Sequence, residues 1–100
     1  MQFLVIGYDG SDDKAQERRM AVRENHLAGV VRMKAAGNAV YGVAMLSDQG
    51  KMIGPLMVVD FPSRNDVDAW LKSEPYVTGN VWQKIEVFPA QVPPMFLQKA

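Results

Sequence analysis

Six segments with regular hydrophobic spacing follow one another along the chain, separated by short stretches rich in glycine, proline, aspartate and serine. Their patterns predict a strand, a long helix, two strands joined by a hairpin, a second helix and a last strand. The predicted ranges are 3–8, 13–36, 39–46, 52–61, 63–72 and 81–88. This βαββαβ order is typical of a ferredoxin-like α+β domain, in which a four-stranded antiparallel sheet carries both helices on one face.

Local signals set the ends of the two predicted helices. Residues 11–13 offer acidic and hydroxyl side chains before the first helix, and Gly37 stands where a left-handed stop ends it. Ser63 followed by Asp66 resembles a capping box for the second helix. A helix of more than twenty residues is long for a domain of this size, so we expect a break or kink near Arg23.

The first and third predicted strands are apolar at four successive positions, 3–6 and 56–59. Because successive side chains of a strand point to opposite faces, each run places two apolar groups on the face that the helices do not reach. An exposed apolar patch of that size is unusual. We therefore expect a homodimer packed through this open sheet face. The alternative is that the C-terminal tail folds back over it.

Composition limits the classes of partner. Eleven basic and eleven acidic residues balance, so neither nucleic acid nor an anionic membrane surface is an expected partner. No apolar stretch approaches the roughly 20 residues that span a bilayer, and the absence of cysteine excludes thiolate chemistry. We expect a cytoplasmic domain over residues 1–90 and a proline-rich tail over 91–100, whose apolar residues 95–97 offer a contact for a larger assembly.

The single histidine, His26, is the first candidate for chemistry. Arg19, Arg23, His26 and Val30 follow at steps of four, three and four, so they share one face of the predicted helix. Two guanidinium groups and an imidazole on one face can bind an anion or handle a proton. The alternative, which spacing alone favours, is the solvated face of a surface helix.

The second candidate is the segment 73–76, which follows a helix and precedes a strand. Pro75 disfavours a helical conformation at Glu74, so the chain leaves the helix there. If the Glu74 carboxylate reaches His26, it fixes the tautomer of the ring, and the pair is suited to general acid–base work. The alternative is a solvated glutamate in a loop.

Tyr8 and Tyr76 are further candidates to line a substrate pocket. The aspartates at 9, 12 and 13 are better explained as helix-capping groups than as ligands of a hard cation. A lone histidine without cysteine is weak support for zinc, and no glycine-rich phosphate loop is present. We therefore predict neither a metal nor a cofactor.

Two motifs resemble a known family. Residues 19–27, RMAVRENHL, resemble the R-x-x-x-R-x-x-H-L signature of the YCII (YciI-like) family, and residues 70–76, WLKSEPY, resemble its W-x-x-x-D-P-[FY] segment. The likeness covers roughly residues 1–90. It implies a subunit of the dimeric α+β barrel type and an active site built from His26 and Glu74. The sequence departs from the pattern at Glu74, where aspartate is usual, at Glu24, where proline is frequent, and at 44–46, where a glycine–proline pair is often found.

These observations favour a small enzyme of the lyase or isomerase type that uses no cofactor and moves a proton on a small cyclic or aromatic, anionic metabolite. His26 would be the acid–base group, Glu74 its orienting partner, and Arg19 or Arg23 the substrate anchor. The alternative is a non-catalytic dimeric module that binds a small ligand in the same cleft.

Overall fold

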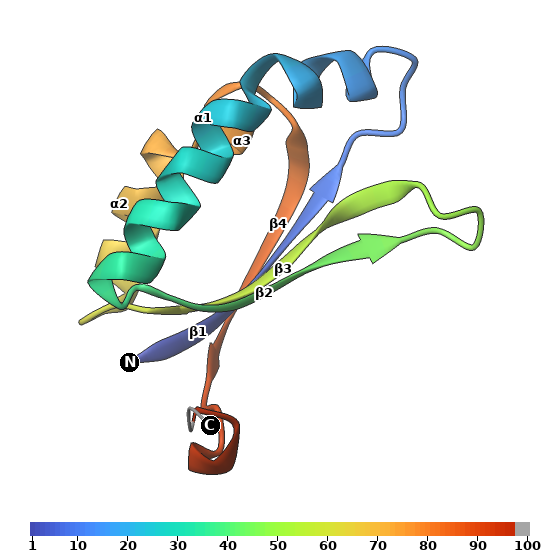
Figure 1. Ribbon diagram of the computed structural model, residues 1–100. Helices are drawn as coiled ribbons and strands as arrows, with labels where there is room; N and C mark the ends of the chain where they lie inside the picture. The colour runs from blue at the N-terminus through green and yellow to red at the C-terminus, as the bar shows by residue number, and fades with distance from the viewer. Residues whose placement is uncertain (98–100) are drawn as a thin grey trace.

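The computed structural model describes residues 1–97 and has the predicted order of strands and long helices. The strands form one antiparallel sheet in the order β2-β3-β1-β4, and both long helices cover the same face (Figure 1). The α+β class and the four-stranded antiparallel sheet are thereby confirmed. The elements are β1 (Gln2–Asp9), α1 (Ala15–Ala36), β2 (Ala39–Leu46), β3 (Met52–Asp60), α2 (Arg64–Ser73), α3 (Pro75–Thr78), β4 (Trp82–Ala90) and the 3-10 turn η1 (Pro94–Phe96).

The core lies between the helices and the sheet. Alternate residues of β1 point into it, so Phe3 and Val5 are fully buried, and Val59 of β3 joins them. Gly7 continues this alternation without a side chain, which makes room for the indole of Trp82. A Cβ atom at position 7 would lie 2.6 Å from Cδ2 of that ring. The missing side chain therefore allows Trp82 to pack flat against β1.

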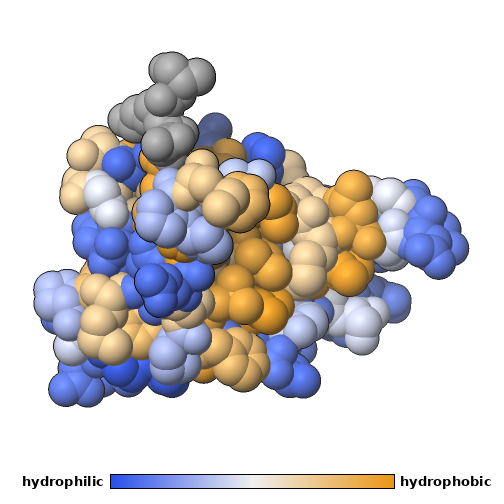
Figure 2. Space-filling view, turned by 90° about the horizontal axis from the view of Figure 1, so that it is seen from below, coloured by the Kyte–Doolittle hydropathy of each residue, from blue (hydrophilic) through white to orange (hydrophobic). Residues whose placement is uncertain are grey.

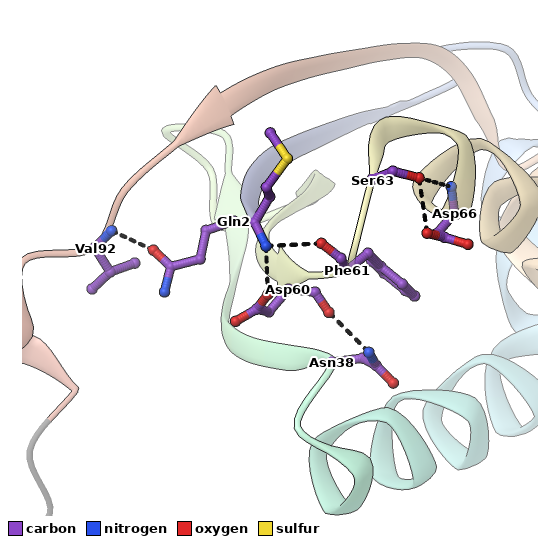
Figure 3. A network of polar contacts seen from close by, with 8 residues as sticks. Gln2, Asn38, Asp60, Phe61, Ser63, Asp66 and Val92 are labelled. Carbon is purple, nitrogen blue, oxygen red and sulfur yellow. Dashed lines mark hydrogen bonds and ion pairs between the residues drawn. The ribbon is translucent and has the colours of Figure 1, made fainter.

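The local helix signals work as predicted at three of the four helix ends. Gly37 has φ +86° and its N–H donates to the carbonyl of Lys34. Ser63 accepts a hydrogen bond from the backbone N–H of Asp66 and donates one to its carboxylate (Figure 3). The start of α1 differs, because Lys14 precedes it without a side-chain cap. The helix runs unbroken to Ala36, and its axis bends in its N-terminal half (Figure 1).

Two elements extend beyond the prediction. The segment expected to be a plain loop after α2 contains the single helical turn α3, which begins at Pro75. Proline is favourable at the first position of a helix because its missing N–H would have no helical partner there. The last strand continues through Pro89 to Ala90. That proline is tolerated because β4 lies at the edge of the sheet.

The sheet face opposite the helices is apolar over its middle and uncovered in the single chain. Leu4 pairs with Val58 and with Phe88, so the three side chains form a row across three strands on this face. Phe88 is 46% exposed. In the next row Ile6 lies between Leu56 of β3 and Glu86 of β4. Seen from below in Figure 2, an apolar surface extends from the middle of the molecule towards the hairpin between β2 and β3.

The described part of the tail, residues 91–97, does not cover this face. It leaves β4 at the end of the sheet, where the N–H of Val92 donates to Oε1 of Gln2 at 2.6 Å (Figure 3). Met95 and Phe96 of η1 are 71% and 74% exposed. Within residues 1–97 no helix has the length and apolar character needed to cross a membrane.

Candidate functional site

Two polar side chains of α1 are buried on its inner face, beside partly buried apolar ones such as Val22 and Met33. Arg19 and His26 are the two residues of this helix that are buried, with 3% and 6% of their surface exposed. Exposed apolar side chains such as Val31 lie on its outer side instead. The helix face that spacing alone leaves ambiguous is therefore turned inwards, and the interpretation of a solvated face is wrong for these two residues.

His26 and Glu74 meet inside the protein. The Nδ1 atom of His26 lies 2.5 Å from Oε1 of Glu74, and the two side chains are 8% and 2% exposed. Glu74 has the extended backbone that Pro75 requires, with φ −67° and ψ 124°. Its side chain turns back to cap α3 by accepting the N–H of Tyr76 at 3.1 Å. One carboxylate oxygen therefore both caps a helix and holds the imidazole.

Aromatic rings fix the plane of the imidazole. Tyr76 stacks on His26 with ring centroids 3.9 Å apart and an angle of 13° between the planes. Trp82 presents its edge to both rings, at 6.0 Å from His26 and 5.8 Å from Tyr76. The buried Nε1 atom of Trp82 has no hydrogen-bond partner among the described residues. The histidine is thus held on one side by a carboxylate and over its face by a ring.

The guanidinium group of Arg19 is hydrogen-bonded to neighbouring side chains. Its Nε and Nη2 atoms donate to the Asp9 carboxylate at 2.7 and 3.2 Å, and its Nη1 donates to the hydroxyl of Tyr76 at 3.2 Å. The guanidinium carbon lies 4.9 Å from the centre of the Tyr76 ring. Burial raises the pKa of Tyr76, and the charges of Arg19 and Arg23 offset only part of that effect.

A cavity of about 310 Å³ lies between α1 and strands β2 and β3. Its polar wall is formed by Arg19, Arg23, His26 and Tyr76. The remaining wall is mainly apolar and includes Leu27, Val30, Val43, Met52, Pro55 and Met57. Four of the six predicted site residues thus line one cavity. Glu74 stands behind His26 and lines a separate hollow of about 440 Å³ between α1 and α2.

Arg23 differs from Arg19 because its guanidinium group has no ion-pair partner among residues 1–97. It is exposed at the cavity. An anionic ligand therefore meets an unpaired guanidinium at Arg23, whereas the charge of Arg19 is already matched by Asp9. Of the two arginines predicted as anchors, Arg23 is the one that can bind substrate without breaking an existing pair.

Tyr8 lies away from this group. Its hydroxyl donates to Glu86 at 2.8 Å, and Lys84 stands 5.2 Å from the centre of its ring. The hydrogen bond to Glu86 raises the pKa of Tyr8. Tyr8 follows Leu4 and Ile6 on the open face of the sheet, and it does not line the cavity beside His26. Its predicted place in the pocket is not supported, because strand alternation turns it to the opposite side.

The aspartates near the start of α1 bind arginines. Asp9 holds Arg19, and Asp12 accepts hydrogen bonds from Arg18 at 2.8 and 2.6 Å, which lower the pKa of that carboxyl. Asp9 does not cap α1, whereas the Asp12 carboxylate also accepts the backbone N–H of Lys14 at 3.2 Å, one residue before the helix begins. Across the part of the chain that the structure describes, no group of three side chains is placed to hold a metal ion. Spacing gave no signal for the Asp9–Arg19 pair, since its members lie on a strand and a helix.

Comparison with known proteins agrees with the motifs. The family model of the YCII-related domain matches residues 1–91. This chain belongs to the YCII family. As a YCII domain it is 26% identical over 95 residues to the protein YciI of Escherichia coli O6:H1, covering 89% of this chain and 95% of that protein. The protein YciI of Shigella flexneri matches to the same extent.

A solved structure with a similar fold is described in complex with a ligand. It is the 5-chloro-2-hydroxyhydroquinone dehydrochlorinase of Burkholderia phenoliruptrix in complex with 2,5-dihydroxybenzoquinone. The two chains superpose with a TM-score of 0.79 and 20% sequence identity, over 95% of this YCII domain and 98% of the other chain. At that identity the likeness demonstrates a shared fold, and the nature of the site rests on the geometry described above.

Proposed function

We propose that this YCII domain is a small enzyme of the lyase or isomerase type that moves a proton on a small cyclic or aromatic metabolite. The observation that carries the proposal is the buried His26–Glu74 pair at the wall of a cavity. A carboxylate that accepts the Nδ1 proton leaves the lone pair of a neutral imidazole on Nε2. Nε2 has no hydrogen-bond partner among residues 1–97, so it is available as a base.

The cavity walls indicate the kind of substrate. One side is apolar and suits a ring, while Arg23 offers an unpaired positive charge to an acidic substituent. Side chains carry the acid–base chemistry, so the proposal requires no cofactor. It is supported by the dehydrochlorinase of similar fold, whose bound molecule is a hydroxylated six-membered ring.

Proton abstraction can be tested without knowing the pathway. Small cyclic and aromatic acids are screened for binding by ligand-observed NMR, and each ligand found is followed for exchange of carbon-bound hydrogen in D2O. We expect exchange that falls by about 100-fold or more in His26→Gln, the usual contribution of a positioned base. Arg32→Gln, which changes an exposed cation outside the cavity, is the control.

The result also decides between the two functions considered. Ligands that bind in the cavity but exchange no hydrogen with the wild-type protein would identify a binding module and refute the enzyme. Exchange that persists in His26→Gln would show that a residue other than His26 is the base.

We also propose that two copies of the domain pack through the open sheet face. The apolar side chains of Leu4, Ile6, Leu56, Val58 and Phe88 lie together on this face and lack a cover from any of the described residues. A twofold contact between identical faces would bury these apolar side chains away from water. The cytoplasmic location and a larger assembly through residues 95–97 stay predictions.

A further inference from the structure

The hydroxyl of Tyr76, we infer, is a catalytic hydrogen-bond donor to an oxyanion that forms in the cavity. The substrate is then a cyclic ketone, whose oxygen gains negative charge when His26 removes a proton from the neighbouring carbon. This inference rests on the function proposed above. It adds the group that stabilises the developing charge and the chemical class of the reacting carbonyl.

The hydrogen-bonding arrangement at Tyr76 leaves its proton free. The phenol oxygen accepts Nη1–H of Arg19 at 3.2 Å, so one lone pair is already occupied. The hydroxyl donates to no described residue, although the ring is 2% exposed and lines the cavity. Donation from a guanidinium into the oxygen also polarises the O–H bond. Burial, which raises the pKa of Tyr76, keeps the phenol protonated and therefore able to donate.

The donor is held rigidly before any ligand arrives. Asp9 grips Arg19 through two hydrogen bonds, and the backbone N–H of Tyr76 is bound by Glu74. The ring itself stacks on His26 at 3.9 Å. Donors that are fixed in advance stabilise a developing charge without a reorganisation cost, which is the basis of an oxyanion hole. Arg19 and Asp9 are positioning residues in this arrangement, because they act through Tyr76.

The proposed step balances without a further reactant. Nε2 of His26 takes the proton from the carbon beside the carbonyl, and the electrons of that C–H bond form a carbon–carbon double bond. The carbonyl electron pair moves to oxygen, which accepts a hydrogen bond from Tyr76 while the tyrosine keeps its proton. When the imidazolium returns a proton to the same carbon, the result is hydrogen exchange without net change. When it returns the proton to the enolate oxygen, the product is the enol, an isomer of the ketone.

Phenolate binding provides the test. The probes are 4-nitrophenolate and 4-nitroanisole, which share a ring but only the first carries an oxyanion, and both are titrated at one mildly alkaline pH. We expect the wild-type protein to bind the phenolate more tightly than 4-nitroanisole. In Tyr76→Phe this preference should fall by about tenfold or more, because that is the usual contribution of a hydrogen bond to a charged group. Binding of 4-nitroanisole should change by less than twofold.

A matched variant separates this effect from general charge attraction. Arg23→Gln removes the unpaired cation and should weaken phenolate binding in low salt, with the loss fading as salt is added. The Tyr76→Phe loss should persist at high salt. The NMR signals of the His26 ring in Tyr76→Phe verify that the stacked arrangement survives the change.

The outcomes distinguish the two proposals. Equal affinity of the wild-type protein for the two probes, or an unchanged preference in Tyr76→Phe, overturns the oxyanion donor and leaves the His26–Glu74 base to be judged by hydrogen exchange. A Tyr76-dependent preference without exchange that depends on His26 overturns the proposed function, and the catalytic role of Tyr76 with it.

Discussion

Glu74 holds His26 through the same carboxylate oxygen that caps the next helical turn. Oε1 lies 2.5 Å from Nδ1 of His26 and 3.1 Å from the N–H of Tyr76. Any movement of the carboxylate therefore affects the backbone of α3 and the imidazole together. The position of the imidazole and the start of α3 therefore depend on the same carboxylate oxygen.

This coupling predicts a large stability loss for Glu74→Ala. The variant removes a helix cap and leaves a buried histidine without its partner, so we expect the free energy of unfolding to fall by about 2 to 4 kcal/mol. Urea unfolding followed by circular dichroism measures it. Glu17→Ala, at an exposed ion pair with Lys14, should change stability by less than about 0.5 kcal/mol. Equal values for the two variants would show that the buried contact contributes little.

Glu74→Asp introduces the residue more usual in the family and should separate the two roles of the carboxylate. Aspartate is a good helix cap, so α3 should persist. Its side chain is one methylene shorter, which draws the carboxylate away from His26. We expect nitrogen NMR of the ring to report the Nδ1-protonated form in the wild-type protein and a mixture of tautomers in the variant. Identical spectra would show that the backbone adjusts to restore the contact.

The open sheet face predicts a mass of twice the 11.1 kDa subunit in solution. Leu56→Glu places a charge in the middle of this face and should convert the protein to a folded monomer, because burying an unpaired carboxylate is costly. Analytical ultracentrifugation gives the mass. Val31→Glu, on the outer side of α1 and already 68% exposed, should leave it unchanged. A wild-type monomer at high concentration would contradict the proposed interface.

The raised pKa of Tyr76 predicts a loss of stability at alkaline pH. Above the ordinary tyrosine value of 10.0 the unfolded chain releases this proton while the folded protein retains it. The unfolded state then binds fewer protons, so the free energy of unfolding falls as the pH rises from 10 towards the folded-state pKa. Tyr76→Phe should flatten this part of the curve, as measured by thermal melts at several pH values. A slope unchanged from the wild-type protein would place the alkaline effect on other groups.

Much of the architecture can be predicted from short stretches of the sequence. Apolar runs in β1 and β3 identify strands that are apolar on both faces, because residues at successive positions point to opposite sides. Gly37 and Ser63 mark helix ends through backbone conformation and capping, and Pro75 forces the chain out of α2. These signals act within a few residues, so they can be interpreted without knowing the rest of the structure.

The site depended on contacts across the fold. Spacing placed Arg19, Arg23 and His26 on one helix face, but it could not show that this face is turned inwards. The pairing of His26 with Glu74 joins residues 48 positions apart, and the sequence pointed to it through the family motifs alone. Arg19 was expected to be free for substrate, but Asp9 occupies it.

Sequence by itself therefore determined the order of strands and helices, the apolar open face and the two motif segments. Tertiary structure decided which polar side chains became buried partners, which cavity they line, and that Tyr8 faces away from Tyr76. The reason is physical: propensity, capping and alternation act along the chain over a few residues. The burial of a charge, by contrast, is favourable only where a partner from another element arrives to meet it.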